Sequence, residues 1–212
     1  MWLLFGASLV LSLVVLLLFY LRLNRHKTPL FREKSDDLTV LIVLGSGGHT
    51  TEMLRLVASL GAHYRRRIYM LAESDSTSER KARELEAQRG SGTFELWRIP
   101  RAREVRQPYL SSVVTTLHSL LHCWPMVRQL RPQLILCNGP GTCVPVCVAF
   151  AVLDIFLIHS SVIVYVESVC RVETLSLSAE ILHSFKIANH LVVQWPELKE
   201  LYPDTVYLGR LV

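Results

Sequence analysis

The chain has 212 residues, a formal net charge of +5, 50% apolar residues and a mean hydropathy of +0.32. This composition excludes a disordered chain and a protein that coats nucleic acid, and it indicates a folded protein associated with a membrane. The length excludes any enzyme that needs two full-sized α/β domains in one chain, because two such domains take roughly 300 residues or more.

The first segment, Met1–Leu21, carries no charge and holds 18 apolar residues, which is long enough to cross a hydrocarbon core. We expect a transmembrane helix here rather than a cleaved signal peptide, because the run has no basic start and no small-residue cleavage site. About 88 of the other 191 residues are apolar, an ordinary proportion for a soluble domain, so a polytopic protein is excluded. The composition therefore fits a chain with one transmembrane anchor followed by one folded domain.

A polar linker over residues 22–37 follows this anchor. Five basic residues against one acid give its Arg22–Lys34 part a net charge of +4. By the positive-inside rule, this charge places residues 38–212 in the cytosol, next to anionic lipid headgroups. The odd number of cysteines, five, without CxxC spacing, suits reduced thiols of a cytosolic domain. A zinc site at Cys143 and Cys147 is disfavoured because no second pair completes four ligands, so we expect no metal.

From Leu38 onward, apolar runs alternate with helical periods. We expect strands over Leu38–Leu44, Ile68–Ala72, Phe94–Ile99, Leu134–Cys137, Val162–Val166, Leu191–Gln194 and Val206–Leu208. The expected helices begin after Gly48 and at a capping box formed by Ser76 and Glu79, and continue with Leu110–Leu130, Cys143–Phe156, Leu177–Phe185 and Glu197–Leu201. This alternation predicts a Rossmann-like α/β domain, with a mostly parallel sheet covered by helices on both faces.

Two of these helices have distinctive patterns. In Leu110–Leu130 we expect Pro125 to kink or restart the helix, and an inward stripe of Val113, Leu117, Leu120, Leu121, Trp124 and Val127. The helix Cys143–Phe156 has almost no polar face, so it is either deeply buried or rests on the membrane or a partner.

The first candidate site is the glycine turn of Gly45, Ser46, Gly47, Gly48, His49 and Thr50. Its glycines let backbone amides approach a phosphate at a helix N-terminus, although they equally suit tight strand-to-helix packing. The turn lacks the third glycine of a dinucleotide fingerprint and the glycine–lysine pair of a triphosphate loop, which disfavours a nicotinamide reductase. A neutral His49 at this helix end is a general base or a hydrogen-bond donor to phosphate; the alternative is a capping or core histidine.

Further candidates follow the later strands, whose carboxyl ends meet at the ligand-binding edge of such a sheet. The segment of Asn138, Gly139, Pro140, Gly141 and Thr142 forms the opposite wall of a cleft or a simple Pro-Gly turn. Glu167 is a base, a sugar-hydroxyl ligand or an ion-pair partner of Arg171, and the sequence leaves all three open. The basic loop of Arg98, Arg101, Arg103 and Arg106 holds a diphosphate or is only solvated.

These motifs resemble one family in order along residues 38–212. The segments are GSGGHT (45–50), IPRAREV (99–105), LCNGPGTCVPVC (136–147), VIVYVESVCRVETLSLS (162–178), VVQWPELKELYP (192–203) and YLGRLV (207–212). The family is the membrane-anchoring subunit of the UDP-N-acetylglucosamine transferase of dolichol-linked oligosaccharide synthesis. The resemblance implies one half of a GT-B-type glycosyltransferase, in the endoplasmic reticulum membrane, with a lumenal N-terminus and a cytosolic domain.

The resemblance also implies what the two halves do. This chain would bind the lipid acceptor, and a soluble partner subunit would bind UDP-N-acetylglucosamine, with no cofactor on this chain and no nucleic acid. Together they would add the second sugar to N-acetylglucosaminyl-diphospho-dolichol with inversion. The glycine turns, with Arg101 and Arg103, would face the acceptor. His49 and Glu167 are the base candidates, and the partner would contact Tyr207, Leu208, Gly209, Leu211 and Val212. The alternative is a non-catalytic membrane scaffold.

Overall fold

The computed structural model describes residues 38–103, 107–139, 141–156 and 161–212. The expected anchor Met1–Leu21 and linker 22–37 lie outside these ranges, as do Glu104 and Arg106 of the basic loop and Pro140 of the second glycine turn. Within the described ranges, the helices are all too short or too polar to span a bilayer.

The described chain alternates between strands and helices from one end to the other. The strands are β1 (Thr39–Val43), β2 (Arg66–Ala72), β3 (Thr93–Ile99), β4 (Leu134–Asn138), β5 (Val162–Val166), β6 (His190–Val193) and β7 (Val206–Tyr207). The helices are α2 (Gly48–Ala58), α3 (Ser76–Arg89), α4 (Tyr109–Leu130), α5 (Cys143–Ile155), α6 (Leu177–Ser184) and α7 (Pro196–Leu201). Each expected element is present, with bounds within about two residues of those predicted.

The strands form one parallel sheet in the order β3-β2-β1-β4-β5-β6-β7. The chain winds outward from β1 to β3, and then returns to the other side of β1 to place β4. This reversal is the topological switch point of a doubly wound sheet, where ligands bind beyond the carboxyl ends of the strands. The predicted Rossmann-like sheet is confirmed.

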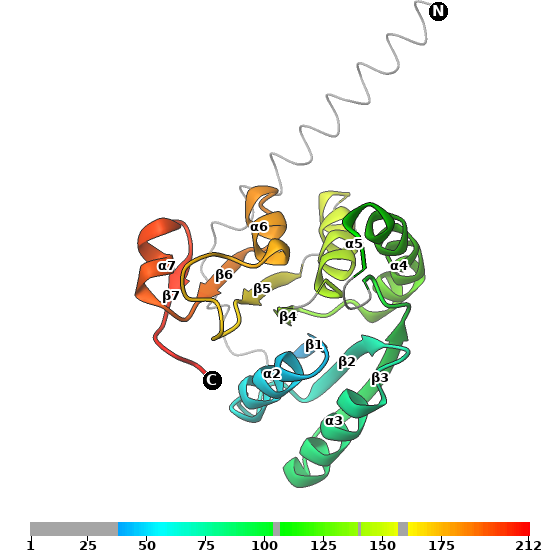
Figure 1. Ribbon diagram of the computed structural model, residues 1–212. Coiled ribbons are helices and arrows are strands. Elements are labelled where there is room, and N and C mark those ends of the chain that lie inside the picture. The colour runs from blue at the N-terminus through cyan, green and yellow to red at the C-terminus, as the bar shows by residue number, and fades with distance from the viewer. Residues whose placement is uncertain (1–37, 104–106, 140, 157–160) are drawn as a thin grey trace, which may run out of the picture.

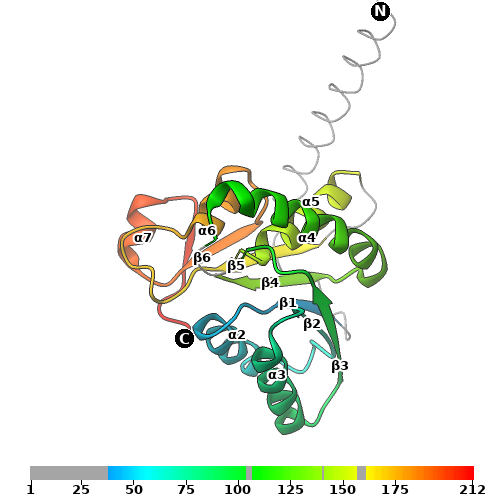
Figure 2. The ribbon, with the colours of Figure 1, turned by 45° about the vertical axis from the view of Figure 1, so that its right-hand side comes forward.

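Helices cover both faces of the sheet (Figures 1 and 2). Helices α2 and α3 lie on one face, and α4, α5 and α6 on the other. The two-residue period of β1 divides its apolar side chains between two cores. Val40 and Ile42 pack toward α2 and α3, whereas Leu41 and Val43 pack toward α4 and α5. Helix α5 is buried along most of its length. Of the two alternatives for its apolar sequence, deep burial is therefore the one that the structure shows.

The predicted inward face of α4 is wrong for four of its six residues and correct for Val127 and Leu120, which pack in or against the core. Three side chains of that stripe, Val113, Leu117 and Leu121, are 55–72% exposed, and Trp124 is 36% exposed. The side chains that face the core include the small residues Ser112, Ser119 and Cys123, together with Val127 and Leu130. Small side chains let α4 approach α5 closely, and the large apolar residues Val113, Leu117 and Leu121 point outward. The helix continues through Pro125 as one element.

The predicted capping box of Ser76 and Glu79 is wrong, and the N-cap of α3 lies one residue earlier. Asp75 is the N-cap, and its carboxylate accepts the backbone N–H of Ser78 at 3.0 Å. The other end agrees with expectation, because Gly90 closes the helix in a left-handed conformation with φ of 61°. Asp75 and Ser76 are both good N-caps, and the choice depends on the backbone after β2.

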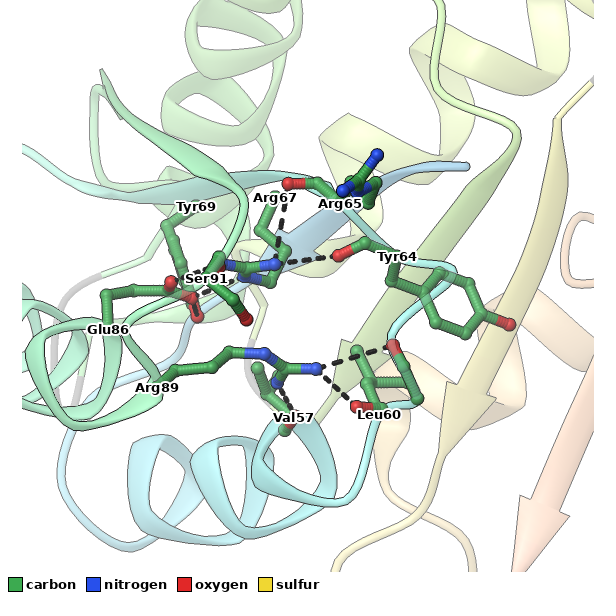
Figure 3. A network of polar contacts seen from close by, with 10 residues as sticks. Val57, Leu60, Tyr64, Arg65, Arg67, Tyr69, Glu86, Arg89 and Ser91 are labelled. Atoms are coloured by element: carbon green, nitrogen blue, oxygen red, sulfur yellow. Dashed lines mark hydrogen bonds and ion pairs between the residues drawn. The ribbon is translucent and has the colours of Figure 1, made fainter. Parts of the chain in front are cut away.

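A buried ion pair ties β2 to α3 (Figure 3). Arg67 donates two hydrogen bonds to the carboxylate of Glu86, at 2.7 and 2.6 Å, and others to the carbonyl oxygens of Tyr64 and Ser91. Tyr69 donates to the same carboxylate at 2.5 Å. Both charged side chains are at most 2% exposed, so this pair lies in the low-dielectric interior. Glu86 raises the pKa of Arg67, and burial, with the neighbouring Glu86, raises the pKa of Tyr69.

Candidate functional site

A cavity of about 840 Å³ opens beyond the carboxyl ends of β1, β4 and β5, at the switch point of the sheet. Its floor comes from the start of α2, the turn after β4 and the loop after β5. Its sides come from α4 and α6. The cavity therefore brings together the three chain segments that the sequence singled out.

The first glycine turn is held from behind by hydroxyl groups. Thr50 Oγ1 donates to the Gly45 carbonyl oxygen at 2.5 Å, and Ser78 Oγ lies 3.0 Å from the same oxygen. Thr50 is buried and belongs to this support rather than to the cavity lining. Gly47, with φ of 65°, is the N-cap of α2, and no side chain caps this end of the helix. Ser46 is exposed. The N-terminus of α2 consequently reaches the cavity at Gly48 and His49.

The second glycine turn makes room for the imidazole of His49. Gly139 has φ of 77°, a left-handed conformation that favours glycine. A Cβ atom at Gly139 would collide with Nδ1, Cε1 and Cγ of His49, so the ring packs directly on the glycine backbone. Gly141 also lines the cavity, whereas Thr142 is buried as the N-cap of α5.

A chain of polar side chains links the cavity lining through Asn138, which is fully buried and, unlike its predicted role, is not itself part of the lining. Asn138 Oδ1 lies 3.2 Å from His49 Nδ1, and Asn138 Nδ2 donates to Glu52 Oε2 at 3.0 Å. Ser168 Oγ donates to the other oxygen of Glu52 at 2.8 Å. The chain joins α2 to the carboxyl ends of β4 and β5, so three segments distant in sequence are fixed relative to one another.

Glu167 is fully buried at the end of β5. Its two carboxylate oxygens accept backbone N–H groups, from Ser168 at 2.9 Å and Ser176 at 2.7 Å. Glu167 therefore holds the loop between β5 and α6 in place. Among the residues that the structure describes, these contacts take the place of the ion pair with Arg171 that the sequence left open. A catalytic role for Glu167 stays a prediction.

Two arginines line the cavity. One is Arg103, which also donates to the Gln107 carbonyl oxygen at 3.0 and 3.3 Å. The other is the exposed Arg171 in the loop after β5. Arg101, the other arginine predicted to bind phosphate, is directed to Ser74 Oγ at 3.2 Å and is not part of the lining. The lining also contains the carboxylates of Glu52 and Glu167, whose oxygens accept hydrogen bonds from within the chain. The two lining cations and the N-terminus of α2 are the groups suited to an anion.

The sides of the cavity are apolar. Val113 and Leu117 of α4 face Leu177 and Ile181 of α6 across it. Val113 and Leu117 also belong to the outward stripe of α4, with Leu110, Val114 and Leu121, all at least 55% exposed. The cavity thus has a polar floor and an apolar wall that continues onto the molecular surface. This arrangement suits an amphiphile with an anionic head and a hydrocarbon tail.

The C-terminal residues lie at the opposite edge of the sheet from β3. Tyr207, Leu208 and Leu211 are 38–65% exposed, and Gly209 has φ of 83°. The backbone N–H groups of Leu211 and Val212 donate to Gln194 Oε1, which holds this segment against β6. An apolar, exposed segment of this kind is available to a partner, and its predicted role in partner binding stays a prediction.

Sequence reasoning missed Glu52 and the lining role of Arg171. A signal for Glu52 is its position one helical turn after His49, which places both side chains on the same face of α2. Arg171 was considered only as a partner for Glu167.

The chain matches the family model for Alg14-like oligosaccharide biosynthesis proteins over residues 40–211. It is 53% identical over 195 residues to the UDP-N-acetylglucosamine transferase subunit ALG14 of Mus musculus, covering 88% of this chain and 87% of the relative. The proteins of the same name from Homo sapiens and Yarrowia lipolytica are 49% and 40% identical. The alignment with the human protein covers 84% of this chain and 84% of the relative. The alignment with the Yarrowia lipolytica protein covers 99% of this chain and 98% of the relative.

Two solved structures share the fold. MurG from Acinetobacter baumannii matches with a TM-score of 0.57 at 15% identity, covering 82% of this chain and 45% of MurG. LpCGTa in complex with UDP matches with a TM-score of 0.53 at 14% identity, covering 83% of this chain and 53% of LpCGTa. The chain therefore spans about half the length of these structures, and its parallel sheet with helices shares their GT-B fold over that half.

Proposed function

The chain belongs to the family of Alg14-like oligosaccharide biosynthesis proteins, and from this premise we propose that it is the acceptor-binding subunit of a two-chain UDP-N-acetylglucosamine transferase. The complex adds the second N-acetylglucosamine to N-acetylglucosaminyl-diphospho-dolichol on the cytosolic face of the endoplasmic reticulum. This chain anchors the complex through Met1–Leu21 and recruits a soluble subunit that binds the sugar nucleotide. It holds no cofactor of its own.

The observation that carries this proposal is the chemistry of the cavity at the switch point. The N-terminus of α2, Arg103 and Arg171 are suited to the two negative charges of a diphosphate. The apolar wall, which Val113 of α4 and Leu177 of α6 help to form, is suited to the first prenyl units of a lipid. A diphospho-prenyl sugar combines these two features in one molecule.

The size of the fold supports the proposal that a second chain completes the enzyme. The described residues match about half of each solved glycosyltransferase, so a second half must come from elsewhere for a complete two-domain enzyme. The exposed C-terminal segment Tyr207–Val212 is the proposed contact with that half.

Within this function, His49 is the proposed general base. Inverting transfer needs a group that takes the proton of the acceptor hydroxyl while the sugar–phosphate bond breaks. Both His49 and Glu167 line the cavity, but His49 is half-buried, whereas Glu167 is fully buried and each of its oxygens accepts a backbone N–H group. Glu167 accordingly shapes the loop around the acceptor.

The test is a transfer assay with three preparations: this chain, the soluble subunit, and both together. UDP-N-acetylglucosamine and a short diphospho-prenyl N-acetylglucosamine acceptor are the substrates. We expect transfer only from the two together, and a loss of at least a hundredfold in kcat for His49→Ala with partner binding unchanged. Transfer by this chain alone would contradict the split enzyme. Undiminished transfer by His49→Ala would instead favour a non-catalytic scaffold.

The same preparation tests acceptor binding without catalysis. Cys170 is an exposed cysteine in the cavity lining, and the other four cysteines are buried. We expect saturating acceptor to slow alkylation of Cys170 by a maleimide at least severalfold, because the acceptor occupies the space in front of the thiol. A prenyl phosphate without the sugar reports on the lipid and phosphate contacts alone. An unchanged alkylation rate would place the acceptor elsewhere.

A further inference from the structure

The side-chain amide of Asn138 has only one favourable orientation in the structure. Its Nδ2 lies 3.0 Å from Glu52 Oε2 and 3.2 Å from the Val166 carbonyl oxygen, and both of these atoms are acceptors. If the amide were rotated by 180°, its Oδ1 would face a carboxylate and a carbonyl, and two acceptors would be left without a donor. Glu52 and Val166 therefore place Asn138 Oδ1 toward His49.

This orientation determines which nitrogen of His49 carries the proton. Asn138 Oδ1, an acceptor, lies 3.2 Å from His49 Nδ1, so a hydrogen bond between them requires the proton on Nδ1. Nε2 of the neutral ring then carries the lone pair. His49 Nε2 makes no hydrogen bond within the part of the chain that the structure describes, and the ring lines the cavity.

We infer that Glu52 and Asn138 are positioning residues that hold His49 in its Nδ1-protonated tautomer, with Nε2 ready to accept a proton. The inference rests on the function proposed above, in which the acceptor hydroxyl attacks the anomeric carbon of UDP-N-acetylglucosamine. In that step the new carbon–oxygen bond forms, the bond to the diphosphate breaks, and UDP leaves with the electron pair. The hydroxyl proton passes to His49 Nε2.

Glu52 is itself held in place on both oxygens. Ser168 Oγ donates to Oε1 at 2.8 Å, and Asn138 Nδ2 donates to Oε2 at 3.0 Å. The carboxylate accordingly acts on His49 through Asn138, as a carboxylate or amide behind a catalytic histidine sets its tautomer. Glutamine at position 52 can keep both contacts, because its Oε1 accepts from Asn138 and its Nε2 donates to Ser168.

The closing experiment follows the imidazole of His49 by NMR in the full-length chain, reconstituted in nanodiscs with its soluble subunit. The histidines carry ¹⁵N, and the His49 signals are identified by their loss in His49→Gln. The ¹⁵N shifts of a neutral ring distinguish the Nδ1-protonated from the Nε2-protonated form. We expect the Nδ1-protonated form in the wild type and in Glu52→Gln, and a substantial Nε2-protonated fraction in Glu52→Ala and Asn138→Leu.

Transfer kinetics are measured on the same variants. We expect kcat to fall roughly ten- to a hundredfold in Glu52→Ala and to recover to within several-fold of the wild type in Glu52→Gln, with KM for the acceptor nearly constant. Arg55→Ala, an exposed residue of the same helix, is the matched control and should change neither readout.

Two results would overturn the inference. One is a wild-type tautomer distribution in both Glu52→Ala and Asn138→Leu. The other is a kcat equally low in Glu52→Gln and Glu52→Ala, which would make the negative charge of Glu52, rather than its position, the essential feature. The tautomer measurement needs no acceptor, so an inactive wild-type complex would contradict the proposed function separately.

Discussion

Gly139 shows how one residue can set the geometry of the site. Its φ of 77° strains any other side chain, and a Cβ atom would collide with the ring of His49. We expect Gly139→Ala to lower the free energy of unfolding by about 1–2 kcal/mol and to displace His49, with kcat reduced at least tenfold. Urea unfolding and the transfer assay measure the two effects.

Gly61→Ala is the control for this substitution. Gly61 has no positive φ, and a Cβ there meets only His63 Cδ2 at 3.8 Å, an ordinary contact distance. Its unfolding free energy should stay within about 0.5 kcal/mol of the wild type. Equal stability of the two variants would show that the backbone at Gly139 relaxes without cost.

The buried pair of Arg67 and Glu86 is expected to be costly to break. Glu86→Ala leaves the guanidinium of Arg67 in the interior without its carboxylate, and Tyr69 also loses its acceptor (Figure 3). We expect a loss of about 3–5 kcal/mol, measured by urea unfolding. Arg67→Met combined with Glu86→Leu should recover much of it, since no buried charge then remains unpaired.

An exposed pair on the neighbouring strands provides the comparison. Arg66 donates to Glu95 at 2.8 Å, with the two side chains 44% and 40% exposed. This contact lowers the pKa of Glu95, but water screens the interaction. Glu95→Ala should therefore cost no more than about 1 kcal/mol. Similar losses for Glu86→Ala and Glu95→Ala would contradict the distinction between buried and exposed pairs.

At the scale of elements, the outward stripe of α4 is the feature that ordinary folding does not explain. Val114 and Leu121 are 67% and 72% exposed and lie outside the cavity lining. If this stripe rests on the bilayer that holds the acceptor, Val114→Gln with Leu121→Gln should weaken vesicle binding of residues 22–212 about tenfold. The unfolding free energy should hardly change. Flotation with phosphatidylcholine–phosphatidylserine vesicles measures the binding.

Leu208→Gln is the matched control for the stripe. Leu208 is 65% exposed, but it lies near the C-terminus at the other end of the sheet. Its replacement removes a comparable apolar side chain and should leave vesicle binding unchanged. Equal weakening by both changes would indicate nonspecific adsorption rather than a membrane-facing helix.

The elements were predictable from local pattern, and their orientation only in part. Strands such as Val162–Val166 are continuous apolar runs, and their bounds follow from the turns beside them. The predicted stripe of α4 combined outward residues such as Val113 and Leu117 with the core residue Val127, because a helical period does not say which side the neighbouring helix occupies. The tight contact with α5 through Ser119 and Cys123 decides this, and it is a tertiary fact.

The site was predictable in its turns but not in its side-chain network. His49 and the glycines were identified from local sequence, because a glycine turn before a helix has a known chemistry. The contacts of Glu52 with Asn138 and Ser168 span 86 and 116 residues. They depend on β4 lying next to β1, and β5 next to β4, an order that the sequence alone does not specify.

For the whole molecule, the buried acidic groups predict a loss of stability at alkaline pH. Burial raises the pKa of Cys123 from 9.0 to about 12, and burial likewise raises the pKa values of Cys137 and Tyr165. Because the folded pKa lies above the unfolded one, the folded chain binds more protons at high pH. The stability from these groups is complete below about pH 9 and is lost as the pH rises toward the folded values.

Cys123 alone should contribute a loss of about 2 kcal/mol by roughly pH 10.5. We therefore expect the Tm of the reduced protein to fall continuously from about pH 9 upward, as measured by circular dichroism at constant ionic strength. Cys123→Ala removes one of these groups and should make the decline shallower, even though its Tm at pH 7 is lower. A Tm that is constant up to about pH 10.5, or the same slope in Cys123→Ala, would show that the thiol becomes ionised within the folded core. That result would require water to reach Cys123 between α4 and α5, where the structure places a fully buried side chain.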